Sequence, residues 1–413
     1  MMHPRVGPLI LFLGVVTFLT AIGNTGLISI MPAIGRMIGM ADYLVASIFS
    51  LSAFTWAISS PFWTRHVAGH GCNLFIRAGL IGFSLSMAGC AGAVALGMNG
   101  IVGPLACFLI FFFLRAIFGL LGSASAIATQ TLVARNTLGA DRTRALTSLA
   151  GALSLGTIVG PAVAPFLMMR PLGATGPMLA YMMIGLLTLA ASFLLLPHER
   201  RRHPEQASVP AAGRHVRLQD IWRQPATAAP LNFGIFLCCA QAINIYTTGF
   251  VLIDRSGDAP AAAQTLIGLT MTGGALAALT AQWALPRLVA ITPRRMTQLG
   301  GTLALLGNLI PLVGDSALHA TIGFIVASFG YGLGRPGYSA QASLAGTDEQ
   351  QVAIATAVSF IAGASITLPP IIATAAYGRW HDAPFALAIV LAVAALGFVV
   401  RGAASRAIVH SGQ

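Results

Sequence analysis

Charged residues are scarce in this chain, and lysine is absent from all 413 positions. Asp, Glu, Lys and Arg together make up only 8% of the sequence, whereas a soluble protein has about 25%. This deficit excludes a water-soluble globular protein, because water requires a surface rich in charged and polar side chains. The net charge of +12 comes from 23 arginines set against 11 acids. No basic cluster with interleaved aromatics occurs, so we expect no nucleic-acid partner.

Sequence signatures of catalytic and metal sites are also missing. The five cysteines (Cys72, Cys90, Cys107, Cys238 and Cys239) are odd in number and lack metal-ligand spacing, so no disulfide framework or zinc site is predicted. No Walker loop, nucleophile elbow or dinucleotide fingerprint is present. We therefore predict a protein that is not an enzyme and that binds no cofactor and no metal.

Long apolar runs fill most of the sequence. Hydrophobic residues make up 56% of the positions and the mean hydropathy is +0.81. Runs of about 20 residues can cross a hydrocarbon core of about 30 Å as helices. The predicted spans are Val6–Met31, Tyr43–Phe62, Leu74–Leu96, Pro104–Gln130, Ala145–Met168, Gly176–Leu196, Leu231–Ile253, Ala263–Leu285, Met296–Val313, Ala317–Ala342, Val352–Tyr377 and Pro384–Ala404. The sequence thus predicts an all-α membrane protein with 12 transmembrane helices.

The predicted spans divide into two sets of six. Residues 1–196 form the expected N-terminal bundle, 197–230 a polar linker with a short amphipathic piece at Arg217–Trp222, and 231–413 the C-terminal bundle. Arg65-His-Val-Ala68 follows the second span and Arg287-Leu-Val-Ala290 follows the eighth. This echo indicates two pseudo-symmetric six-helix bundles, an arrangement in which transporters bind substrate near the bilayer midplane.

The arginines are distributed unevenly between the expected loops. With a cytoplasmic N-terminus, 17 of the 23 lie on the cytoplasmic side. Four lie outside (Arg36, Arg170, Arg255 and Arg379), and Arg115 and Arg335 lie within spans. The positive-inside rule therefore places both termini and the linker in the cytoplasm. We expect a bacterial inner-membrane protein, multi-pass and monomeric.

Arg115 is the principal functional candidate, because it lies near the middle of the fourth span. An arginine there costs about 2.5–3.5 kcal/mol on insertion scales. Its side chain must face a wet cavity, where it could bind an anionic group or modulate a proton site, or it must bond helix carbonyls in a structural role. Arg335, in the tenth span, either reaches the cavity or snorkels to the interface.

Amides and hydroxyls in two other spans are further candidates for substrate or coupling residues. Asn24 and Thr25 lie in the first span, and Gln241, Asn244 and Thr248 share one helical face of the seventh. Interhelical hydrogen bonding is the alternative role for such residues. All the acids are expected in loops or at span ends, so a carboxylate proton carrier is not evident. Asp42, Asp254 and Asp315 qualify only if they lie below the membrane surface.

Gly156 and Gly160 lie four residues apart and are followed by Pro161. Two small residues on one helix face allow close approach of a neighbouring backbone, and the proline removes an intrahelical hydrogen bond. Such a face either seals and releases one side of a rocking transporter or serves as a plain packing seam. We interpret it as a gating element.

These motifs give the whole chain a resemblance to the major facilitator superfamily, within it to the 12-helix drug:proton antiporters. Gly156-Thr-Ile-Val-Gly160-Pro161 resembles the fifth-helix GxxxGPxxGG motif, with Ala164-Pro165 in place of the final glycines. Arg115-Ala-Ile-Phe-Gly119 resembles the fourth-helix RxxQG motif, with Phe118 in place of glutamine. In Pro61-Phe-Trp-Thr-Arg65, an arginine stands where the family's loop motif usually has aspartate.

The resemblance implies a secondary transporter that works by alternating access, with a small-molecule substrate, protons and the lipid bilayer as partners. The resemblance to antiporters implies export in exchange for protons, and arginine and amides without mid-span acids favour a polar or anionic solute. The general run of the sequence, particularly Asn24–Arg36, resembles exporters that accompany hydroxamate siderophore synthesis, so a siderophore is the expected substrate. The alternatives are multidrug or antibiotic efflux, metabolite import by the same fold, and a non-transporting membrane sensor.

Overall fold

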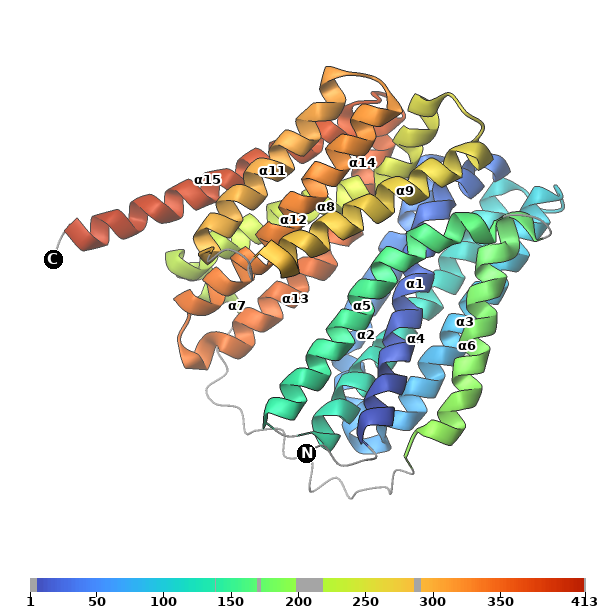
Figure 1. Cartoon of the computed structure of the whole chain (residues 1–413), viewed down its shortest axis with the longest axis horizontal. Helices are drawn as coiled ribbons and strands as arrows, with labels where there is room; N and C mark the ends of the chain where they lie inside the picture. Colours follow the sequence, from blue (N-terminus) through green and yellow to red (C-terminus); the bar gives the residue numbers. More distant parts are fainter. Residues whose placement is uncertain (1–5, 138, 169–171, 198–217, 286–290, 412–413) are drawn as a thin grey trace. The chain divides into compact units, whose positions relative to one another are not determined.

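The computed structural model describes residues 6–137, 139–168, 172–197, 218–285 and 291–411, and these residues form helices and short connections without strands (Figure 1). The helices of the first half are α1 (Val6–Ile38), α2 (Asp42–His70), α3 (Cys72–Met98), α4 (Pro104–Asn136), α5 (Gly139–Leu167), the 3₁₀ turn η1 (Gly173–Thr175) and α6 (Gly176–Leu195). Those of the second half are α7 (Leu218–Arg223), α8 (Pro225–Ser256), α9 (Pro260–Leu279), the π turn η3 (Thr280–Ala284), α11 (Pro293–Val313), α12 (Ala317–Ala345), the 3₁₀ turn η4 (Asp348–Gln350), α13 (Gln351–Thr367), α14 (Pro369–Tyr377) and α15 (Ala383–Ser411).

Length and composition make these helices membrane spans. Among the described residues, eleven helices are long and apolar enough to cross a bilayer, and Ala383–Val399 of α15 is a shorter apolar segment. Every predicted span corresponds to one of these segments, so the all-α, multi-span class is confirmed. The helical fold is expected, since hydrocarbon leaves the backbone no other hydrogen-bond partners.

Helix boundaries follow proline and glycine. Proline occupies the first turn of α4, α6, α8, α9, α11 and α14, where its missing N–H costs no helical hydrogen bond. Gly71, with φ of 90°, separates α2 from α3, and Gly257 ends α8 in the left-handed conformation. α8 begins at Pro225, six residues before the predicted start at Leu231.

The eleventh span is not the continuous helix that the sequence predicts. α13 ends at Thr367 and α14 begins at Pro369. Two consecutive prolines, Pro369 and Pro370, lack the N–H groups that would continue the helical hydrogen bonds, while the backbone of Leu368 stays in the helical region. Leu368 therefore marks a break inside the span Ala353–Tyr377.

The chain divides into two compact units, Met1–Val209 with Pro260–Leu269, and Pro210–Ala259 with Thr270–Gln413. In unit 1, α1 packs on α5, and α4 packs on α2 and α3. The end at which α6 stops is called the linker end of this unit. Asn73, at the start of α3, donates to the Pro197 carbonyl there, and Arg135, at the end of α4, lies 3.6 Å from the Cys72 sulfur.

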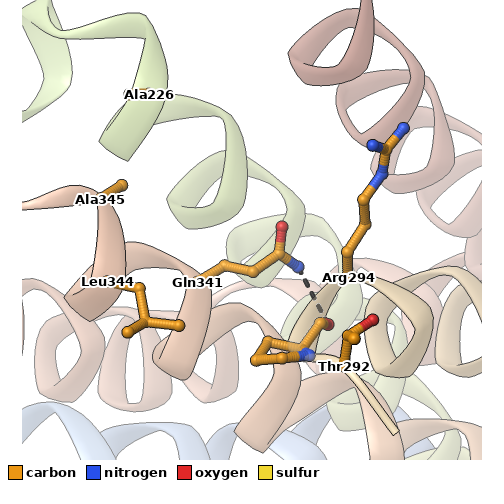
Figure 2. Close-up of a pocket in the computed structure, with 7 residues that line it drawn as sticks. Ala226, Thr292, Arg294, Gln341, Leu344 and Ala345 are labelled. Carbon is orange, nitrogen blue, oxygen red and sulfur yellow. Dashed lines mark hydrogen bonds between the residues drawn. The ribbon is translucent and has the colours of Figure 1, made fainter. Parts of the chain in front are cut away.

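In unit 2, α8 packs on α12 and α15, and α11 packs on α12. The end at which α8 starts is the linker end of unit 2. Gln341 holds α12 against α11 at this end. Its Nε2 donates to the Pro293 carbonyl at 3.1 Å (Figure 2) and to the Thr297 hydroxyl at 2.8 Å. The opposite end of each unit is called the far end.

Candidate functional site: a buried arginine and the first helix

Arg115 is buried inside unit 1, with 1% of its surface exposed. It lies on α4, and its guanidinium donates a hydrogen bond to Oδ1 of Asn24 on α1. Two residues chosen separately from the sequence are thus in direct contact. An amide oxygen is a suitable acceptor for a buried guanidinium, because an unsatisfied charge in an apolar interior is costly.

Aromatic rings complete the surroundings of Arg115. Its guanidinium carbon lies 4.4 Å from the Phe118 ring centre and 5.5 Å from that of Phe49. Phe118 occupies the position at which the family motif has glutamine. The ring therefore supplies a cation–π contact instead of an amide hydrogen bond.

The small-residue face of α5 packs directly on the backbone of α1. A Cβ atom on Gly156 would lie 2.7 Å from the Phe18 carbonyl oxygen, and one on Gly160 would lie 2.8 Å from the Gly26 nitrogen. Such distances are too short for any side chain, so both positions require glycine at this approach. Tyr181 of α6 adds its hydroxyl 3.5 Å from the Gly160 carbonyl.

Thr25 belongs to this seam. Its hydroxyl contacts the Ala21 carbonyl at 2.9 Å and the Gly156 carbonyl at 3.2 Å. A Cβ on Gly160 would lie only 2.2 Å from the same hydroxyl. Pro161 follows within α5, and its carbonyl oxygen would be 2.8 Å from a Cβ on Gly268 of the same unit. Thr25 is thus a helix-packing residue in this conformation.

Asn24 and Thr25 are consecutive on α1 and contact different neighbours. Asn24 holds Arg115 of α4, and Thr25 contacts Gly156 of α5. One turn of α1 therefore lies between the buried charge and the glycine face. A displacement of α5 along α1 would change the packing next to the arginine.

The three candidates on α8 do not act as one group. Asn244 donates to the Tyr331 hydroxyl at 3.1 Å, and Thr248 donates to the Asn244 carbonyl at 2.6 Å. Gln241 is partly buried and makes no side-chain hydrogen bond to the part of the chain that the structure describes. Only Asn244 engages another helix.

Tyr331 of α12 and Asn308 of α11 were missed by the sequence reasoning. Asn308 also donates to the Tyr331 hydroxyl, at 3.1 Å, and all three side chains are buried. Asn244 and Tyr331 lie on the first and fourth spans of unit 2, as Asn24 and Arg115 do in unit 1. In the sequence, Asn308 is a weak indication of a polar contact because it lies within a span, and Tyr331 gives no such indication.

Arg335 is exposed at its position on α12 and has no ion pair or side-chain hydrogen bond among the described residues. Its neighbours Tyr331 and Tyr338 are buried. The side chain thus leaves the interior of unit 2. It does not reproduce the buried environment of Arg115.

The acids of the described residues lie near helix ends or in connections, and the three coupling candidates differ. Asp42, at the start of α2, pairs with Arg36 at 2.8 Å. Asp254 accepts a hydrogen bond of 2.5 Å from Tyr377. Asp315 lies 4.0 Å from Arg255, and 99% of its side chain is exposed.

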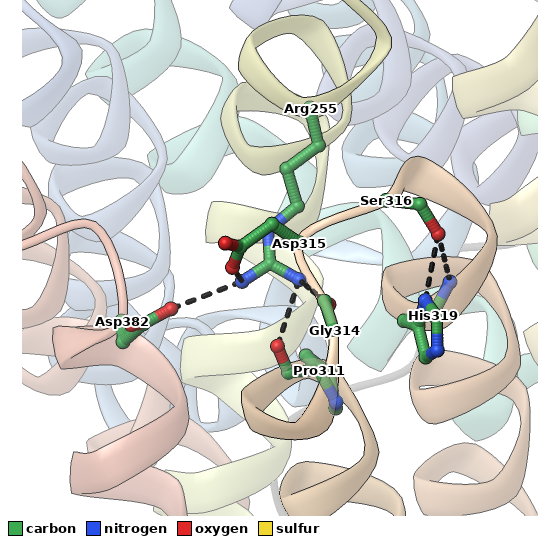
Figure 3. A network of polar contacts seen from close by, with 7 residues as sticks. All are labelled: Arg255, Pro311, Gly314, Asp315, Ser316, His319 and Asp382. Atoms are coloured by element: carbon green, nitrogen blue, oxygen red, sulfur yellow. Dashed lines mark hydrogen bonds and ion pairs between the residues drawn. The ribbon is translucent and has the colours of Figure 1, made fainter.

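A second arginine, Arg255, organises the far end of unit 2 (Figure 3). One terminal nitrogen donates to the Pro311 and Gly314 carbonyls at 2.9 and 3.1 Å, and the other lies 3.0 Å from Asp382. Nine per cent of the side chain is exposed. The sequence placed this arginine in an outside loop, whereas α8 extends to Ser256 and the side chain turns into the bundle.

Comparison with known proteins assigns the class. A family model described as Major Facilitator Superfamily matches residues 13–368. The chain therefore belongs to the major facilitator superfamily. It is a multi-pass membrane protein and a secondary transporter. No curated protein sequence matches it.

Solved transporter structures share the fold. A bacterial homologue of the human lysosomal transporter Spinster, inward-facing and unoccupied, is 12% identical with a TM-score of 0.72, over 98% of this chain and 96% of that one. The nucleoside transporter NupG is 11% identical with a TM-score of 0.74, over 96% and 98%. A POT family transporter in complex with a thioalcohol-conjugated peptide is 11% identical with a TM-score of 0.66, over 95% and 94%. At these identities the likeness concerns the fold alone.

Proposed function

We propose that this transporter exports a small polar or anionic organic molecule in exchange for protons. The contact that carries the proposal is the pair of consecutive α1 residues, Asn24 and Thr25, between Arg115 and the Gly156–Gly160 face. During alternating access, α5 slides on α1 at its glycine face. That movement alters the surroundings of Arg115. Closure of one side of the transporter is thereby coupled to the affinity of Arg115 for an anionic group of the substrate.

The positions of the charges favour this substrate class over cationic drugs. Arginine and amides supply the polar groups in the middle of the spans, while the described acids lie near helix ends. A buried cation attracts anionic and hydrogen-bond-accepting groups and repels other cations. Within this class we propose a hydroxamate siderophore, in agreement with the sequence resemblance. The protein acts as a monomer in the bacterial inner membrane with both termini in the cytoplasm.

The proposal is tested by comparing small molecules in cells and medium, with and without the gene, under iron-replete and iron-starved growth. An iron chelator that accumulates inside the deletion strain and declines outside supports siderophore export. Accumulation of a different solute inside the deletion strain would refute the siderophore as substrate and would still support export. A solute depleted inside the deletion strain identifies an importer, and no solute difference identifies a non-transporting sensor.

Complementation makes the experiment specific to the proposed site. The wild-type gene and Arg379→Ala should restore the distribution, because Arg379 is exposed and has no ion pair or side-chain hydrogen bond within the described chain. Arg115→Ala should not restore it. Equal restoration by both variants would remove Arg115 from the mechanism.

A further inference from the structure

A cavity of about 300 Å³ lies at the linker end of unit 2 (Figure 2). It is formed where α8 and α11 begin and α12 ends. Its polar lining consists of Thr292, Arg294 and Gln341, and its apolar lining includes Ala226, Leu344 and Ala345. A hollow with a cationic side and an apolar side suits an amphiphilic ligand.

The polar side of this cavity is electropositive. Arg294 and Arg295 stand in the first turn of α11, which contains no acid. Both are exposed, and neither has an ion pair or side-chain hydrogen bond with any residue that the structure describes. Cations at a helix N-terminus are normally unfavourable, because the helix dipole is positive there. An anion at this position would relieve the repulsion.

The apolar side of the cavity is open. Leu344, near the end of α12, has 78% of its surface exposed. The walls are nonetheless held in place, since Gln341 bonds both Pro293 and the buried Thr297. A ligand could therefore enter without moving the helices.

We propose that this cavity binds the phosphate headgroup of an anionic phospholipid. Arg294 contacts the phosphate, the Thr292 hydroxyl lies beside it, and Leu344, Ala226 and Ala345 contact the glycerol and the start of an acyl chain. Basic pockets between transmembrane helices bind such headgroups at the membrane surface. The proposal depends on neither the transported substrate nor its direction.

The test is native mass spectrometry of the full chain released from detergent, with phosphatidylglycerol or phosphatidylcholine added. Phosphatidylglycerol should give the higher-occupancy adduct. Its affinity should fall about tenfold in Arg294→Ala, the equivalent of about 1.4 kcal/mol, and in Leu344→Glu, which places a negative charge at the exposed apolar wall. Arg294→Lys should retain part of the binding. Arg379→Ala, which removes an exposed arginine away from the cavity, should retain all of it.

Inorganic phosphate distinguishes the lipid from a soluble anion. If the lipid is the ligand, excess phosphate leaves the phosphatidylglycerol adduct in place. Displacement by phosphate would overturn the lipid assignment and indicate an anion site. Equal phosphatidylglycerol binding by the wild type, Arg294→Ala and Leu344→Glu would overturn the site itself, whatever the protein transports.

Discussion

Arg115 and Asn24 form a hydrogen bond in which the guanidinium is the donor and the amide oxygen is the acceptor. The guanidinium needs acceptors because it is charged in an apolar interior, and the oxygen of the partly buried Asn24 accepts its hydrogen bond. Phe118 and Phe49 then shield the pair from water, which strengthens its electrostatics. The fourth helix thereby presents a fixed positive charge rather than a mobile one.

Arg115→Ala should reduce export at least tenfold, because it removes the charge that we assign to the anionic group. It also leaves Asn24 without this donor, which costs about 1–3 kcal/mol. Arg115→Lys keeps the charge but not the planar geometry, so it should retain folding and part of the transport. The measurements are export rate and thermal stability in detergent. Full export by the alanine variant at wild-type expression would contradict the assignment.

Asn24→Leu removes the hydrogen-bond acceptor and leaves the charge of Arg115 in place, so it distinguishes the role of Asn24 from that of the arginine. If Asn24 only satisfies Arg115, this variant should lose stability and alter substrate affinity while some transport remains. Unchanged affinity and stability would show that the contact is dispensable. Export and melting temperature are measured beside those of Arg115→Ala.

At this scale the sequence predicts candidates better than contacts. Arg115 and Asn24 are recognisable because polar residues in a span are expensive and need partners. Thr25, a candidate for substrate or coupling with interhelical hydrogen bonding as the alternative, contacts α5 rather than Arg115, since a one-residue step turns the side chain by about 100° around a helix. Tyr331 could not be found, because its role depends on Asn244 and Asn308 from two other helices.

The α1–α5 pair is the element that relates the buried charge to a possible movement. Backbone approach at Gly156 and Gly160 leaves no side chain between the helices. Small-residue faces permit sliding at short distance, and they also lose close packing when a methyl group is added. The motif itself was readable from sequence, whereas the partner helix was not, because pairing between distant helices is a tertiary property.

Gly160→Ala and Gly151→Ala form a matched pair on α5. A Cβ on Gly160 meets Thr25 and the α1 backbone, whereas one on Gly151 meets nothing within 4 Å. Overpacking costs about 1–3 kcal/mol, so Gly160→Ala should lower stability and slow transport, while Gly151→Ala should change neither. The readouts are melting temperature and export rate. Equal behaviour of the two variants would argue against a specific seam.

The far end of α8 is a second connecting element. Arg255 contacts the last carbonyls of α11 and the acid before α15, and Tyr377 of α14 donates to Asp254. Cations at a helix C-terminus also interact favourably with its dipole. Two consecutive residues of α8 thus tie three neighbouring segments together.

Arg255→Ala should destabilise the protein by about 2–3 kcal/mol, since it removes charge-assisted hydrogen bonds from a nearly buried group. Arg379→Ala serves as the exposed control. Asp382→Asn should have a smaller effect, because the two carbonyl contacts of Arg255 remain. Denaturation in detergent would measure these changes, and equal stability of Arg255→Ala and the control would show that the network is not stabilising.

The similarity between the two halves of the chain is clearer in their side-chain contacts than in their amino-acid sequences. Asn24 bonds the fourth span of unit 1, and Asn244 bonds the corresponding span of unit 2. Arg36 follows Asn24 by twelve residues and pairs with Asp42; Arg255 follows Asn244 by eleven and pairs with Asp382. The two contacts differ in residue type and in direction, because Asn24 accepts from Arg115 whereas Asn244 donates to Tyr331. The halves share a plan, and the buried charge belongs to unit 1.

The twelve-span plan was predictable because the bilayer constrains length and polarity together. The break at Leu368 and the early start of α8 at Pro225 were not predictable from hydropathy. Hydropathy locates the hydrocarbon crossing, whereas a helix continues beyond it or breaks within it according to local prolines and packing. The inward turn of Arg255 belongs to the same group of unpredicted features.

Orientation is testable by labelling intact cells with a membrane-impermeant maleimide. Asp258→Cys lies beyond α8 at the far end, and the exposed Arg144→Cys lies near the linker end of α5. A cytoplasmic linker predicts that Asp258→Cys reacts in intact cells and Arg144→Cys only after permeabilisation. Four of the five native cysteines are buried, so the background should be low. The reverse pattern would invert the topology.

Proton-driven export is tested most directly in inside-out membrane vesicles. The probe is the molecule that accumulates in the deletion strain, and its uptake is measured with and without an acid-inside pH gradient. We predict uptake that requires the gradient, disappears with a protonophore and is lost in Arg115→Ala but not in Arg379→Ala. Uptake that is indifferent to the gradient, or equal in the two variants, would contradict proton-coupled export through Arg115.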